Sequence, residues 1–248
     1  PSVPESRLIV DLMEHVNRAF QISDGAEISM EANPGTVTRE KLKEYRRAGI
    51  NRISFGLQSA NDRELKLLGR IHTWAEFLES FHLARECGFT NINIDLMSAL
   101  PGQTRESWKD TLKRVTDLEP EHISAYSLII EEGTPFGEKY GSEEGRKLLP
   151  DEDSEREMYH ETKRFLRECG YERYEISNYA KPGRECRHNI GYWTGVPYLG
   201  LGLGASSYMN GSRFAVSSDM QQYLEEKPGT FTDVEKLTKK DMEEEFFY

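Results

Sequence analysis

The chain has 248 residues, of which 37% are hydrophobic, and its formal net charge is -11. That length and apolar content suit one large α/β domain, alone or with a smaller appendage. The acidic balance argues against a nucleic-acid partner, because phosphates are bound mainly through lysine and arginine. No apolar stretch approaches the roughly 18 residues of a membrane span. Three widely separated cysteines, at positions 87, 169 and 186, indicate a reducing compartment, and we expect a cytoplasmic protein.

The first 130 residues alternate between helical and strand patterns. Strands are predicted to begin near residues 27, 51, 91 and 122, with a helical pattern between each pair. Helices are expected to start at the capping residues Thr38, Asn61, Thr73 and Thr104. Right-handed crossovers of this kind give a parallel sheet, either doubly wound or curled into a barrel.

Polar side chains interrupt or end these strands. Asp95 lies in an otherwise apolar run that is typical of a strand buried on both faces. A buried carboxylate needs a partner, a ligand or a solvated barrel mouth. Glu31 and Gln58 end two other strands, and Ser127 is a further candidate. Because the carboxyl ends of parallel strands meet at one edge, we expect these residues to converge on one cleft.

The residue types at this edge suit a nucleoside-type ligand. The carboxylates of Glu31 and Asp95 can accept hydrogen bonds from hydroxyls or an ammonium group, and the Gln58 amide can donate and accept. Arg70, twelve residues after Gln58, can pair with a ligand carboxylate. The alternative is that each side chain only caps a helix or pairs within the protein.

After residue 130 the pattern changes. Residues 131–153 predict a long surface connection without a helix, followed by a helix and a strand-like segment at 171–176. Residues 199–205 are rich in glycine but lack dinucleotide-binding spacing, so they predict a tight backbone passage. Cys186 and His188 are either structural residues or ligands of a metal or haem. The last residues look like an amphipathic helix that stops with the chain.

Five ordered segments resemble the oxygen-independent coproporphyrinogen III oxidase family of radical S-adenosylmethionine (SAM) proteins. They are residues 31–35, 52–59, 68–72, 91–97 together with 100–104, and 122–126. Segments 174–178, 184–193 and 198–202 resemble the branch of HemW-type haem chaperones. That branch carries an H-N-x-x-Y-W motif, which is matched by His188, Asn189, Tyr192 and Trp193.

The resemblance implies a partial (β/α)6 radical SAM barrel that lacks its first strands, with an α+β extension. Residues 1–130 would form the third to sixth barrel strands, and residues 131–248 the truncated extension. The implied SAM contacts are Glu31, Gln58, Arg70, Asp95, Ile129, Ala205 and Ser206. His188 and Cys186 are possible haem ligands.

The resemblance also implies a [4Fe-4S] cluster, but the C-x3-C-x2-C loop that would hold it is absent from these residues and is expected upstream of Pro1. The implied function is that of a haem chaperone, with an electron donor for the cluster and haem-accepting proteins as partners. One alternative is coproporphyrinogen III oxidase, a dehydrogenase that decarboxylates porphyrinogen propionates to vinyl groups. Another is a barrel enzyme with neither cluster nor SAM.

Overall fold

We analysed a computed structural model of the chain, which describes residues 1–225 and 231–241. The chain divides into two compact units, Pro1–Glu185 and Cys186–Tyr248. The boundary predicted at residue 130 lies earlier in the chain than this division. That residue 130 separates the barrel from the C-terminal extension of the family stays a prediction.

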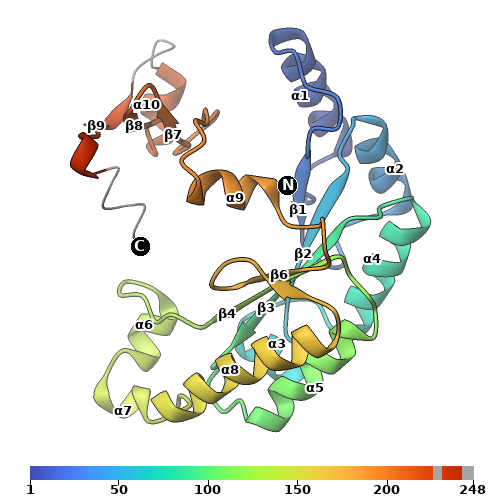
Figure 1. The fold of residues 1–248 in the computed structure, drawn as a ribbon, viewed down its shortest axis with the longest axis vertical. Coiled ribbons are helices and arrows are strands. Elements are labelled where there is room, and N and C mark those ends of the chain that lie inside the picture. Colours follow the sequence, from blue (N-terminus) through green and yellow to red (C-terminus); the bar gives the residue numbers. More distant parts are fainter. Residues whose placement is uncertain (226–230, 242–248) are drawn as a thin grey trace. The chain divides into compact units, whose positions relative to one another are not determined.

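The first unit is built on a sheet of six strands (Figure 1). Four of them pair in parallel and in chain order: β1 (Ser29–Ala32), β2 (Arg52–Gln58), β3 (Ile92–Ser98) and β4 (His122–Ser127). Two antiparallel strands, β6 (Asn178–Ala180) and β5 (Glu172–Arg173), extend the sheet beyond β4. The predicted parallel βα array is therefore confirmed.

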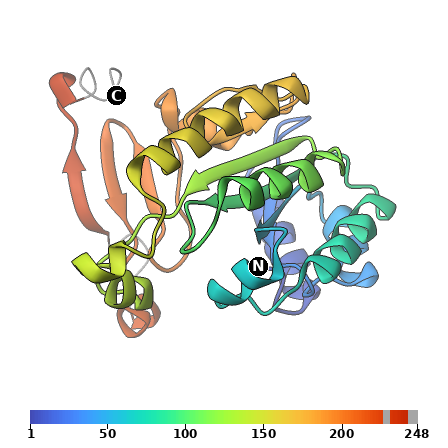
Figure 2. The ribbon, with the colours of Figure 1, turned by 90° about the horizontal axis from the view of Figure 1, so that it is seen from below.

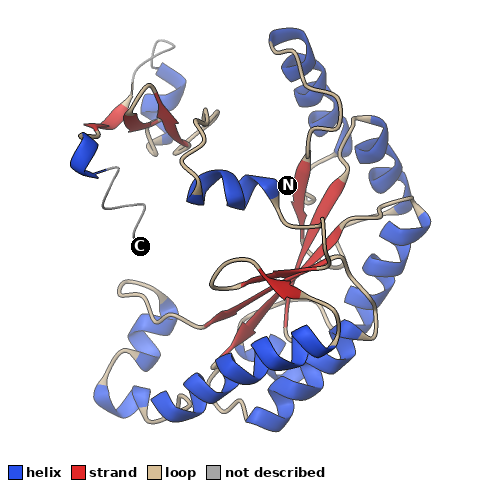
Figure 3. Ribbon diagram, viewed as in Figure 1, coloured by secondary structure: helices blue, strands red, loops and turns tan. Residues whose placement is uncertain are grey.

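Helix α1 (Ser6–Ala19) precedes β1. The helices α2 (Arg39–Arg47), α3 (Asp62–Leu67), α4 (Trp74–Glu86) and α5 (Arg105–Thr116) follow strands and begin after the predicted capping residues, and α8 (Glu152–Glu168) comes later in the chain. The side chains of Thr38, Thr73 and Thr104 accept from the backbone of α2, α4 and α5, and Asn61 does so for α3. The helices α2, α4 and α5 lie along one side of the sheet (Figure 3).

The two faces of the parallel strands differ in chemistry. Ile53, Phe55, Ile94 and Leu96 are fully buried in the hydrophobic core, together with Trp108 of α5. Neighbouring positions, such as Ser54 and Asn93, turn polar groups to the other face. Strict alternation places Ile92, Ile94 and Leu96 on one face of β3, and Asn93, Asp95 and Met97 on the other. Ile94 and Asn93 are buried on opposite faces, so the expectation of a strand buried on both faces is confirmed, although one of these faces carries polar side chains.

Residues 131–153 contain two short helices, α6 (Pro135–Tyr140) and α7 (Glu143–Arg146), so the prediction of a connection without helices was wrong. Thr134 and Ser142 cap them by accepting from the backbone N–H groups of Gly137 and Gly145. Helix α8 then packs beside α5 (Figure 2), where Trp108 Nε1 donates to Thr162 Oγ1 over 2.8 Å. These contacts attach the segment after β4 to the sheet.

The second unit contains α9 (Arg187–Trp193), α10 (Met220–Glu225) and an antiparallel sheet of β7 (Ser206–Met209), β8 (Ser212–Ala215) and β9 (Thr232–Lys236). The tight passage predicted at the glycine-rich segment is present, because a Cβ on Gly200 would collide with the Ser206 carbonyl. The helix predicted at the end of the chain lies outside the described residues. None of the helices in the described ranges has the length and apolar character needed to cross a bilayer.

Candidate functional site

A polar pocket of about 230 Å³ opens on the polar face of the parallel strands. Its walls include Glu31 of β1, Gln58 of β2, Asp95 of β3 and Arg70, which follows α3. The structure thus brings together the four residues that the strand pattern and the resemblance single out in the barrel portion. Glu31, Gln58 and Arg70 lie at or beyond the ends of their elements, whereas Asp95 lies in the middle of its strand.

The register of the strands explains which side chains reach the pocket. Glu31 pairs with Ser54, and Asp95 pairs with Ser124, so these four positions share one face. Tyr126 is two residues beyond Ser124 and therefore faces the same way, and its side chain lines the pocket.

Ser127, the candidate named from the sequence, does not line the pocket. Its hydroxyl lies 3.3 Å from that of Ser98, its partner on β3. Tyr126 lines the pocket instead of Ser127. Once Asp95 is known to pair with Ser124, alternation along β4 predicts that Tyr126 faces the pocket and Ser127 does not.

Gln58 is held in an unusual backbone conformation. Its φ is 76°, and the register of β2 shifts between Phe55 and Gln58. Such bulges and left-handed residues redirect side chains at functional sites. The Tyr126 hydroxyl donates to Gln58 Oε1 over 2.9 Å, which leaves the Nε2 group as the donor that the amide presents to a ligand.

Gly56 forms part of the pocket wall because it has no side chain. A Cβ there would lie 3.3 Å from Arg70 Nη2 and 3.3 Å from Gln58 Nε2. Both nitrogen donors thus border the space above this glycine. A side chain at position 56 would take the room in which a ligand meets them.

Asp95 is a half-buried carboxylate that accepts hydrogen bonds from neighbouring side chains. Asn93 Nδ2 donates to it over 2.7 Å, and Ser54 Oγ donates over 3.1 Å. Burial raises the pKa of Asp95 above its usual value, and the nearby Glu31 carboxylate raises it further. A ligand with hydroxyl or ammonium groups would donate hydrogen bonds to this carboxylate and so offset the cost of burying its negative charge.

The pocket therefore pairs cationic and amide donors with two carboxylate acceptors. Such a site suits a ligand that carries an anionic group and also ammonium or hydroxyl donors, as a zwitterionic nucleoside does. SAM has these groups, so the residues fit it. For an iron-sulfur cluster, no group of three His, Cys, Asp or Glu in the described ranges can hold a metal, and none of Cys87, Cys169 and Cys186 forms a disulfide there.

The other three predicted SAM contacts are not among the residues that line this pocket. Ile129 follows β4 and has 76% of its surface exposed. Ala205 and Ser206 belong to the second unit.

The two possible haem ligands differ in access. Cys186 is only 4% exposed and stands at the N-cap of α9. His188 is exposed on α9, where its ring meets Tyr192 edge to face with ring centroids 4.5 Å apart. Large apolar side chains in the same unit are also exposed, among them Ile190, Trp193 and Leu201. Apolar surface beside an accessible imidazole suits a flat, largely apolar ligand.

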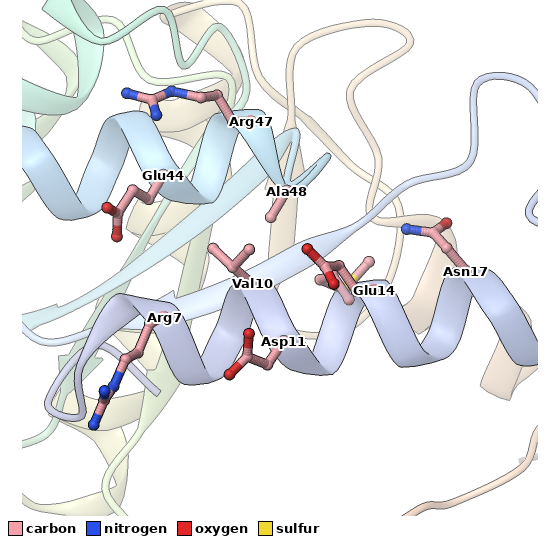
Figure 4. A pocket seen from close by; sticks show the side chains of 9 residues that line it. Arg7, Val10, Asp11, Glu14, Asn17, Glu44, Arg47 and Ala48 are labelled. Carbon is pink, nitrogen blue, oxygen red and sulfur yellow. The ribbon is translucent and has the colours of Figure 1, made fainter.

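A second hollow of about 350 Å³ lies between α1 and α2, away from the strand face (Figure 4). Charges of both signs, including Arg7, Asp11, Glu44 and Arg47, alternate there with Val10 and Met13. These are residues of two exposed helix surfaces, and none was singled out from the sequence.

Residues 4–115 match the sequence family described as the radical SAM superfamily. Over this stretch the chain is similar to radical SAM proteins. Over 241 residues it is 39% identical to the protein named "Heme chaperone HemW" of Bacillus subtilis, a match that covers 95% of this chain and 63% of that protein. The protein of the same name from Haemophilus influenzae is 42% identical over 205 residues, or 83% of this chain and 52% of its own length.

Among solved structures, the radical SAM enzyme coproporphyrinogen III oxidase (HemN) of Escherichia coli superimposes with a TM-score of 0.82. The sequences are 26% identical, and the match covers 99% of this chain and 59% of that one. This likeness confirms the predicted radical SAM barrel fold. The chain spans roughly half to two thirds of the length of these relatives.

Proposed function

We propose that this protein is a cytoplasmic haem chaperone of the HemW type, which binds haem and SAM and works with a [4Fe-4S] cluster. The observation that carries the proposal is the 39% identity to the Bacillus subtilis relative over 95% of this chain. The pocket supports the SAM part, because Arg70 and Gln58 offer donors while Glu31 and Asp95 offer acceptors. The cluster would need ligands other than the three cysteines of this sequence.

For haem, His188 is a better ligand than Cys186. Its imidazole is accessible on α9 and lies edge to face with the Tyr192 ring, whereas the Cys186 thiol is buried at the start of the helix. Haem iron is commonly held by histidine, and the exposed apolar residues of the unit would cover the porphyrin faces. The protein would pass haem to haem-requiring proteins and would need an electron donor for its cluster.

A second candidate function is that of coproporphyrinogen III oxidase. It is favoured by the structural likeness to the Escherichia coli enzyme, which has a TM-score of 0.82. In that case the protein would use SAM to convert propionate side chains of a porphyrinogen to vinyl groups. The lower sequence identity, 26% against 39%, favours the chaperone.

Haem titration tests the first proposal. The wild-type chain is expected to give a shifted Soret band that saturates at one haem per chain. His188→Ala should lose that band, and Cys186→Ser should keep it, because the buried thiol is not the ligand in this account. No Soret shift at stoichiometric haem would overturn the proposal.

Product analysis tests the second candidate. After cluster reconstitution, the protein is incubated anaerobically with SAM and coproporphyrinogen III. The chaperone proposal predicts that coproporphyrinogen III is recovered unchanged. Formation of the vinyl product would establish the oxidase instead.

A further inference from the structure

A chain of buried hydrogen bonds runs from Asp95 away from the pocket. Asn93 Nδ2 donates to Asp95 Oδ1 over 2.7 Å. On its other side, Asn93 Oδ1 lies 2.5 Å from His122 Nδ1, and His122 Nε2 lies 2.7 Å from the Tyr174 hydroxyl. Asn93 and His122 are 2% and 0% exposed, so little water competes for these bonds. Two strands, β3 and β4, and the loop between β5 and β6 are joined in this way.

The direction of each bond follows from charge and valence. The Asn93 amide must turn its nitrogen to Asp95, because an amide oxygen there would face a carboxylate oxygen. Its oxygen then accepts, so His122 Nδ1 carries a proton. Burial, together with the positive charge of Arg52, lowers the pKa of His122 to about 3, so the ring is neutral. Nε2 is therefore an acceptor, and the Tyr174 hydroxyl donates to it.

Every donor in the chain thus points toward the Asp95 carboxylate. Bonds aligned in one direction polarise one another, so each donor strengthens the next. Ser54 completes the arrangement by accepting from Asn93 over 2.8 Å and donating to the second oxygen of Asp95. Both oxygens of the Asp95 carboxylate therefore accept a hydrogen bond from within the protein. These bonds fix the orientation of the carboxylate and so the direction in which its remaining lone pairs point.

We propose that Tyr174 and His122, neither of which lines the pocket, position the Asp95 carboxylate for its ligand. This role rests on the proposed function, in which that ligand is SAM. It also gives a reason for the attachment of β5 and β6 to the parallel strands, since the loop between them supplies Tyr174. Tyr174 is 79 positions from Asp95 in the chain, so its effect on the site acts only through the fold.

The titratable side chains on the pocket side of Asp95 are Glu31 of β1, Tyr126 of β4 and Arg70 after α3, and Pro1 also lines the pocket. All three remain in place when the buried chain is altered. A change in the pKa of Asp95 therefore reports on the donors behind it.

The test is an NMR titration of the Asp95 carboxyl carbon in protein labelled with ¹³C-aspartate. Tyr174→Phe removes the last donor, and we expect the pKa of Asp95 to rise because its carboxylate is less well stabilised. Tyr171→Phe is the matched control: its buried hydroxyl donates to the Pro120 carbonyl over 2.8 Å and does not lead to Asp95. An equal pKa of Asp95 in wild type and Tyr174→Phe, or an equal rise in both variants, would overturn the role.

A second pair of variants tests His122 itself. His122→Gln keeps a group that can donate to Asn93 and accept from Tyr174, whereas His122→Leu can do neither. The pKa of Asp95 should stay near the wild-type value in the first and rise in the second. If the leucine variant does not fold, the glutamine variant and Tyr174→Phe still decide the question.

Calorimetric titration of the same proteins with SAM distinguishes a failure of the proposed function from a failure of the positioning role. Tyr174→Phe is expected to bind SAM about threefold more weakly than wild type, and Tyr171→Phe to bind it equally well. A wild-type chain that binds no SAM would overturn the proposed function. Wild-type binding that Tyr174→Phe leaves unchanged would overturn the positioning role alone.

Discussion

The Tyr126 hydroxyl donates a hydrogen bond to Gln58 Oε1 over 2.9 Å, which joins β4 to β2 across the intervening strand. The bond fixes which end of the Gln58 amide a ligand meets. It accompanies the left-handed backbone of Gln58, whose φ of 76° is uncommon for a residue other than glycine. Two local features that are 68 residues apart thus define one donor of the pocket.

Tyr126→Phe should remove the hydrogen bond that orients the Gln58 amide. The amide can then rotate and present its oxygen, so we expect the Kd for SAM to rise about threefold to tenfold, as the loss of one hydrogen bond implies. Calorimetric titration measures this change. Tyr45→Phe serves as the control, because the Tyr45 hydroxyl is buried and has no hydrogen-bond partner among the residues that the structure describes. Equal Kd values for wild type and Tyr126→Phe would show that Gln58 is oriented in another way.

Gly56→Ala should weaken binding without weakening the fold. The new methyl group would lie 3.3 Å from the donor nitrogens of Arg70 and Gln58 and would occupy ligand space. Alanine is otherwise more favourable than glycine within a strand by about 0.5–1 kcal/mol. The expected result is a Kd for SAM at least about tenfold higher, with a melting temperature no lower than that of wild type. A variant that binds as tightly as wild type would place the ligand elsewhere.

Asp95→Asn should stabilise the empty protein at neutral pH. Burial raises the folded-state pKa of Asp95 above its unfolded value, so the stability it contributes is present in acid and is lost as pH rises through the folded pKa. Asparagine does not ionise, so the variant does not lose stability as the pH rises. Urea unfolding at several pH values should therefore show an advantage of the variant near pH 7 that disappears in acid. Parallel curves at all pH values would contradict the assigned direction of the shift.

Thr162→Val should destabilise the contact between α5 and α8. The indole N–H of Trp108 is buried and donates to Thr162 Oγ1, so valine leaves it without its partner. A buried unsatisfied donor costs about 1–3 kcal/mol. Thr162→Ser keeps the hydroxyl and is the matched control. Urea unfolding should rank serine above valine, and the reverse order would mean that packing outweighs this hydrogen bond.

Local patterns in the sequence predicted the parts of the fold that depend on neighbours in the chain. The strands and the caps at Thr38, Thr73 and Thr104 were correct because alternation and capping act within a few residues. The helices α6 and α7 were missed because their charges and glycines hid the caps at Thr134 and Ser142.

The candidate site depended on long-range register, which the sequence does not contain. Asp95 was found because it interrupts an apolar strand, and Glu31 and Gln58 were found because they are polar residues at strand ends. Tyr126 was missed in favour of Ser127, since the pairing of Asp95 with Ser124 decides which side of β4 faces the pocket. The contact of His122 with Tyr174 joins residues 52 positions apart and could not be predicted from spacing.

The central claim is that the polar face of β1 to β4 binds SAM, and one calorimetric comparison tests it most directly. Arg70 lines this pocket, and Arg47 lines the separate hollow between α1 and α2. The account predicts binding of one SAM per wild-type chain, at least about tenfold weaker binding by Arg70→Ala, and wild-type affinity in Arg47→Ala. Equal affinities of the two variants, or no binding by the wild-type chain, would contradict it.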